Sequence, residues 1–148
     1  MRFMLIVKAS KDSVAGIPPT KELMAAMGAF NEKMAQAGVM LAGEGLQPSS
    51  KGARVKFPGG KKPVVVEGPF AETKELIAGF WLIQAKSKAE AIEWAKRVPP
   101  PMGPGVDSEI EVRQVFEASD FPSDVLPPEA VAREETLRKE LERKAAKK

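Results

Sequence analysis

The apolar positions of this chain predict strands that differ in how many of their faces are buried. Residues 2–8 and 78–85 carry apolar side chains on both faces, a pattern typical of strands that are covered on both sides. Residues 109–117 alternate between apolar and polar positions at their start, which predicts a strand with one apolar face. Residues 39–46 have the composition of a further strand, interrupted by two glycines.

A β-hairpin is predicted in the middle of the chain. Residues 53–57 and 63–66 are short runs rich in β-branched and apolar residues, and they flank the segment 58–62, Pro-Gly-Gly-Lys-Lys. Such a segment between two strand-like runs is typical of a hairpin turn. Alternation along the first arm places Arg54 and Lys56 on one face of the hairpin.

Two helices are predicted between the strands, each with a capping signal. Thr20 is a plausible N-cap for a helix whose apolar residues recur at helical spacing until Gly38 ends it. Its methionines, Met24, Met27 and Met34, are interpreted as core filling without a cofactor role. Residues 87–90, Ser-Lys-Ala-Glu, form a capping box for a second helix that ends before three prolines. A short helix near 127–132 and a charged one near 133–147 are predicted to close the chain.

The order of these elements predicts an α+β fold of the ferredoxin-like kind, with a β-hairpin inserted between its two βα units. Both helices of such a fold lie on one face of the sheet, which leaves the other face bare. Since 2–8 and 78–85 are apolar on both faces, the bare face should meet another sheet. The simplest partner is a second copy related by a two-fold axis, so we predict a homodimer with a barrel-like core, a dimeric α/β barrel.

Composition narrows the classes of function. The chain has no cysteine and no histidine, which excludes disulfides, thiolate catalysis, Ser-His arrangements and the commonest transition-metal ligands. The net charge is only +3, and residues 129–148 supply much of it with seven basic and five acidic side chains. Nucleic-acid binding is therefore not expected, because it calls for a concentrated basic face. No apolar run is long enough to cross a bilayer, and we predict a cytoplasmic protein.

Residues 67–75, Glu-Gly-Pro-Phe-Ala-Glu-Thr-Lys-Glu, resemble the DGPFAETKE motif of the YCII-related (YciI-like) family, with Glu67 in place of the family's first aspartate. The likeness extends through residues 41–55, 79–83, 90–95 and 109–117. It covers residues 1–122 as one domain and leaves residues 123–148 as a charged C-terminal helical extension. The resemblance implies a ferredoxin-like, dimeric α/β-barrel fold. Some members carry a His-Asp pair proposed to act in a pocket, a mechanism that does not transfer to a chain without histidine.

The charged residues around this motif are the candidate site. Glu67 follows a β-branched strand, where burial would raise its pKa toward a value useful for proton transfer, so it is the candidate catalytic residue. Arg54 lies on the hairpin arm that can pair with the strand ending at Glu67, so the two side chains could meet across strands. The remaining candidates for ligand binding are Gln47, Ser49, Lys74 and Glu72. The alternative reading is a set of surface ion pairs and local loop hydrogen bonds.

Two functions remain open from the sequence. The first is a small dimeric protein with a polar pocket for a small organic, anionic ligand, with acid/base isomerase or lyase chemistry if it is an enzyme at all. The second is a non-catalytic regulatory module whose charged tail binds a protein partner; the family resemblance adds a link to sigma-factor-controlled transcription. No cofactor and no metal site are predicted, because the carboxylates match no calcium loop and no phosphate-binding glycine pattern is present.

Overall fold

The computed structural model describes residues 1–11, 15–71 and 75–146. Backbone contacts divide the chain into two compact units, Met1–Val115 and Phe116–Lys148. The boundary predicted at residues 122 and 123 falls inside the second unit.

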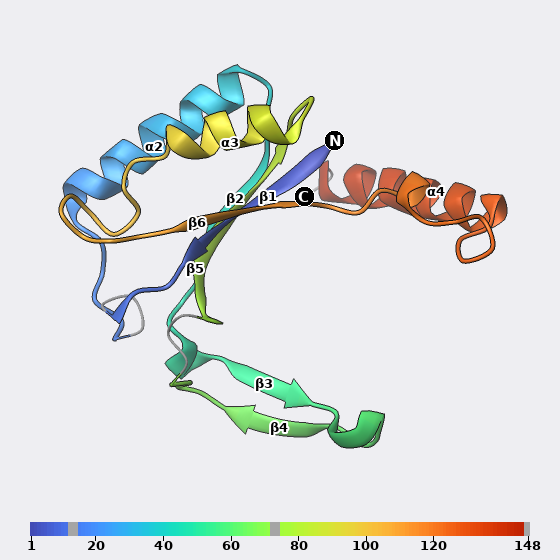
Figure 1. Cartoon of the computed structure of the whole chain (residues 1–148), viewed down its shortest axis with the longest axis horizontal. Helices are drawn as coiled ribbons and strands as arrows, with labels where there is room; N and C mark the ends of the chain where they lie inside the picture. The colour runs from blue at the N-terminus through green and yellow to red at the C-terminus, as the bar shows by residue number, and fades with distance from the viewer. Residues whose placement is uncertain (12–14, 72–74, 147–148) are drawn as a thin grey trace. The chain divides into compact units, whose positions relative to one another are not determined.

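The first unit is built on a four-stranded antiparallel sheet with the strand order β2-β5-β1-β6 (Figure 1). Its strands are β1 (Arg2–Lys8), β2 (Met40–Gly45), β5 (Ile77–Gln84) and β6 (Ile110–Gln114). The predicted hairpin is confirmed as β3 (Ala53–Lys56) and β4 (Val64–Glu67). The last strand is shorter than the predicted 109–117.

Both predicted helices of this unit are confirmed, as α2 (Lys21–Gln36) and α3 (Lys88–Lys96). The Thr20 hydroxyl oxygen accepts from the Leu23 N–H at 3.1 Å, which satisfies one of the free donors at the helix start. Ser87 does the same for Glu90. The capping box itself is only half formed, because the Glu90 carboxylate accepts from the N–H of Lys86 rather than from that of Ser87.

The core lies between the sheet and these two helices, which cover the same face of the sheet (Figure 1). Phe30 of α2 is buried and sets its ring edge-on to Trp81 of β5 at a centroid distance of 5.6 Å, and to Trp94 of α3 at 6.4 Å. Met34 is also buried. The prediction that Met24 fills the core is wrong, since its side chain is 58% exposed near the start of α2.

The second unit contains one long helix, α4 (Pro128–Ala146), where the sequence predicted two. No glycine or proline lies between residues 129 and 146, so nothing interrupts the backbone hydrogen bonding. In the segment that precedes this helix in sequence, the rings of Phe116 and Phe121 pack against each other with a centroid distance of 4.9 Å. None of the described helices is both long enough and apolar enough to span a membrane.

Candidate functional site

The segment Gly68–Pro69–Phe70, here called the GPF turn, is tied to a loop far upstream in the sequence. The Gly68 N–H donates to the carbonyl of Gly52 at 2.9 Å. The Phe70 N–H donates to the Ser49 hydroxyl oxygen at 3.2 Å. The peptide bond between Gly68 and Pro69 is cis. These two hydrogen bonds place the turn directly against the short 3₁₀ turn Ser49–Lys51.

Gly68 is required by this close approach. A Cβ atom at this position would lie 2.7 Å from the carbonyl carbon of Ser49 and 3.3 Å from the Gly52 oxygen, and it would collide with the Ser49 oxygen. These neighbours are backbone atoms, which cannot move aside as the end of a flexible side chain can. Only glycine therefore fits here, for a reason of space rather than of backbone conformation.

Arg54 and Phe70 form the centre of the same cluster. The guanidinium carbon of Arg54 lies 3.9 Å from the centroid of the Phe70 ring, within the range of a cation–π contact. Phe70 is only partly buried and is not among the residues of the hydrophobic core. The ring of Phe70 instead contacts the guanidinium group of Arg54 on β3.

The structure brings two of the predicted site residues together and leaves the others apart or undescribed. Ser49 and Arg54 both contact Phe70 of the GPF turn. Gln47 is exposed, two residues before Ser49. Glu67 is exposed as well, so the burial predicted for it is wrong. Glu72 and Lys74 lie outside the described residues.

The register of the hairpin separates Arg54 from Glu67. The predicted pairing of β3 with β4 is confirmed, but Arg54 is opposite Val66 and Glu67 is opposite Ala53. Directly opposed residues of an antiparallel pair share a face, and successive residues alternate. The predicted meeting of Arg54 and Glu67 across the strands is therefore wrong, because their side chains leave the hairpin on opposite faces.

The sheet face away from α2 and α3 is apolar along its middle. Met4 is opposed to Leu82, and Ile6 to Phe80, so these four side chains share one face. All four are half-buried, whereas the alternate residues of the same strands are fully buried beneath the helices. We call this surface, formed by Met4, Ile6, Phe80 and Leu82, the open sheet face.

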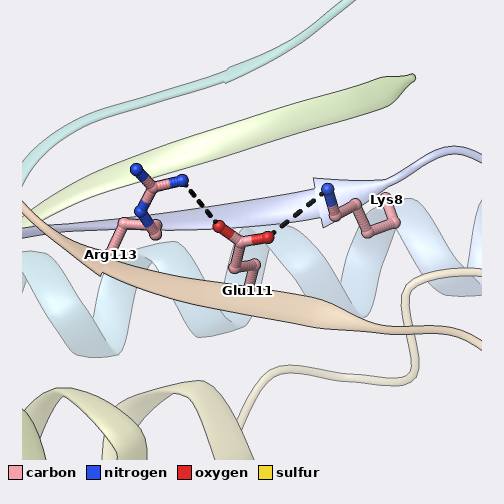
Figure 2. Close-up of polar contacts among 3 residues, drawn as sticks. All are labelled: Lys8, Glu111 and Arg113. Carbon is pink, nitrogen blue, oxygen red and sulfur yellow. Dashed lines mark hydrogen bonds and ion pairs between the residues drawn. The ribbon is translucent and has the colours of Figure 1, made fainter. Parts of the chain in front are cut away.

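Three charged residues meet beside the open sheet face on its β6 side and were missed by the sequence analysis (Figure 2). Glu111 of β6 is opposed to Ile6, and its carboxylate lies 3.4 Å from Lys8 Nζ and 3.0 Å from Arg113 Nη1. The alternation of residues in β6 could have predicted their position. Glu111 and Arg113 are opposed to Ile6 and Met4 of β1, so they lie on the same apolar face of the sheet. Two cations around one carboxylate leave this corner with a net positive charge.

The ion pairs at this corner lower the pKa of Glu111. The main cause is the hydrogen bond from Arg113, and the attraction of Lys8 lowers the pKa further. Partial desolvation of the carboxylate acts in the opposite direction and raises the pKa. Because the folded-state pKa is depressed, the stabilisation is present above the unfolded value of about 4.3 and is lost as the pH falls through the folded value. We expect NMR titration of the Glu111 carboxyl carbon to show a rise in pKa for Arg113→Ala, because this variant removes the largest single cause of the lowered pKa. Equal pKa values in wild type and Arg113→Ala would contradict this assignment.

A groove beside α3 lies apart from the predicted site residues that the structure describes. A shallow groove of about 480 Å³ lies between α3 and β6, and its lining is largely apolar, with Lys96 and Glu109 among the few charged residues. None of the predicted site residues lines it. Within residues 1–11, 15–71 and 75–146, no group of three or more histidine, cysteine, aspartate or glutamate side chains is placed to hold a metal ion.

Comparison with known proteins places the chain among relatives. The family model described as the YCII-related domain matches residues 1–119. An uncharacterized protein of Rhizobium meliloti (strain 1021) is 34% identical over 76 residues, which is 51% of this chain. The match spans 60% of the length of that relative. Because the family model matches most of its length, this chain belongs to the YCII-related family.

Proposed function

We propose that this protein binds a small organic anion at the GPF turn and acts as a homodimer in the cytoplasm. The observation that supports binding best is the convergence of Arg54, Ser49 and Phe70 from three separate segments. A guanidinium offers several fixed donors that match a carboxylate. The Ser49 oxygen accepts from the Phe70 N–H, and its hydroxyl hydrogen supplies a donor toward a ligand.

The other predicted residues extend this proposal. Gln47 lies in the adjoining loop and carries both amide donors and an acceptor. Glu72 and Lys74 follow the GPF turn in sequence and are proposed as further ligand contacts. Glu67 is proposed as the proton acceptor if isomerase or lyase chemistry takes place. The side chain of Glu67 is exposed to solvent, so binding is better supported than catalysis at this site.

The homodimer is proposed through the open sheet face. The strand order β2-β5-β1-β6 of an antiparallel sheet, with its helices on one side, is the arrangement of a ferredoxin-like fold. Its open face leaves a row of aliphatic and aromatic side chains only half-buried in the single chain. Packing two such faces around a two-fold axis would give the dimeric barrel.

Ligand binding can be tested with a library of small carboxylates and other organic acids in a thermal-shift assay. A ligand present at 100 times its Kd raises the free energy of unfolding by about 2.7 kcal/mol. We expect the stabilising ligand to lose at least about tenfold in affinity for Arg54→Gln, and little for Lys61→Gln at the hairpin tip. Unchanged affinity in Arg54→Gln would rule out the GPF turn as the binding site.

A regulatory module is the second candidate, supported by α4. This helix of 19 residues buries none of its side chains among the described residues. A helix of this kind gains most of its stability from packing, so a binding surface is a reasonable role for it. No stabilising ligand, together with capture of a protein partner that depends on residues 128–146, would favour this function over the first.

A further inference from the structure

Helix α4 carries a narrow apolar stripe that is exposed in the single chain. Leu137 and Leu141 are 53% and 58% exposed, although leucine side chains on long helices are usually packed. Ala130 lies one heptad before Leu137 and continues the same stripe. All three residues belong to the second unit, and none of them is part of the GPF turn or of the open sheet face.

The charges beside this stripe are arranged in two rows. At 100° per residue, Glu134 and Arg138 lie along one edge of the stripe. The other edge carries, in order, Glu129, Arg133, Glu140 and Lys144. Glu134 and Arg138 form an ion pair of 3.4 Å within the helix, which confirms that they share an edge.

We propose that α4 pairs with α4 of a second copy of this chain in an antiparallel arrangement centred on Leu137. In an antiparallel pair, residues on the same edge of the two helices face each other. With Leu137 at the two-fold axis, Glu129 faces Lys144 of the second copy, Arg133 faces Glu140, and Glu134 faces Arg138. Each of these contacts occurs twice and joins opposite charges.

The same charges oppose a parallel pair. Parallel helices bring opposite edges together, with a residue facing the position five further along in the second copy. Glu129 would then face Glu134, and Arg133 would face Arg138, so both contacts would join like charges. The sequence of α4 therefore selects the antiparallel orientation as well as a second copy of itself.

Single cysteines can report this pairing because the chain has none of its own. In the full-length protein, we expect mild oxidation to cross-link Leu137→Cys into a covalent dimer. In Leu141→Cys the two thiols would be eight residues apart along the axis, about 12 Å, which is beyond the reach of a disulfide. Lys139→Cys lies on the opposite face of the helix and measures cross-linking by random collision.

The charge pattern can be tested in the Leu137→Cys chain. Adding Arg133→Glu should slow cross-linking by about three- to tenfold, the effect of a few exposed ion pairs, and adding Glu140→Arg as well should restore the rate. The slowing should shrink in high salt. The same order of rates is expected in the Ile6→Glu background, so loss of the sheet contact does not affect this test.

The rates decide between three outcomes. Fast cross-linking at position 137 with slow reaction at 141 and 139, and rescue by the double charge swap, supports the proposal. Fast reaction at both 137 and 141 indicates a parallel pair and overturns it. Equal rates at all three positions, or no rescue, overturns the pairing altogether.

Discussion

Replacing Ile6 by glutamate is expected to convert the proposed dimer into a folded monomer. Ile6 lies in the middle of the open sheet face, opposed to Phe80 on one side and to Glu111 on the other. Packing two such faces together would bury two new carboxylates beside the existing Glu111. Lys8 and Arg113 already pair with Glu111, so the new carboxylates would be buried without full charge compensation. Burial of such a charge costs several kcal/mol, so the Kd of the dimer should rise by at least about a hundredfold.

Sedimentation equilibrium at low micromolar concentration measures this change. Both the reference chain and the variant should carry Leu137→Glu, so that pairing through α4 does not hold two copies together. Met24→Glu is a matched control, because Met24 is an exposed apolar residue on α2 and belongs to neither surface. Circular dichroism confirms that each monomer is folded. A reference chain that already sediments as a monomer, or an Ile6→Glu chain that remains dimeric, would show that the open sheet face is not the interface.

Replacing Gly68 by alanine should destabilise the first unit and disable the candidate site together. The added methyl group meets the Ser49 carbonyl group, so either the GPF turn or the loop at Ser49–Lys51 must move. Forcing an extra methyl into a packed site typically costs about 1–3 kcal/mol, and contact with backbone places this case at the upper end. Movement of the turn also breaks the Phe70–Ser49 hydrogen bond and the Arg54–Phe70 contact.

Chemical denaturation of wild type and Gly68→Ala gives the difference in free energy of unfolding. Gly52→Ala is the control in the same loop, because its methyl group would meet only the Ser49 oxygen, at an ordinary distance of 3.6 Å. Its stability should stay within about 1 kcal/mol of wild type. Equal stability of Gly68→Ala and wild type would mean that the turn does not pack against the loop as described.

The secondary structure of the first unit could be predicted because its signals are local. The Thr20 and Ser87 caps act on backbone groups three residues away, and the short apolar runs of β1 and β5 are signals contained within each strand. The division of the C-terminal segment into two helices was the exception. The sequence analysis placed a short helix near 127–132 and a charged one near 133–147, but α4 is continuous, since residues 129–146 contain no glycine or proline.

The candidate site was predicted only in part, because residue type and position in sequence do not determine burial or strand register. The choice of Arg54 and Ser49 as neighbours of the motif followed from the hairpin and its flanking loop. The exposure of Glu67 depends on how β4 leaves the hairpin. Glu67 and Arg54 lie on opposite faces because of the register between β3 and β4. A shift of this register by one residue would place both side chains on the same face.

The sequence by itself determined the order of strands and helices, the apolar character of both sheet faces and the absence of histidine and cysteine chemistry. Tertiary structure alone decided that Gly68 must be glycine, since the atom that excludes a side chain belongs to Ser49, far upstream in the chain. It also decided that Lys8, Glu111 and Arg113 meet beside the open sheet face. Local patterns fix what each segment becomes, whereas contacts between distant segments form only when the sheet brings β1 and β6 together.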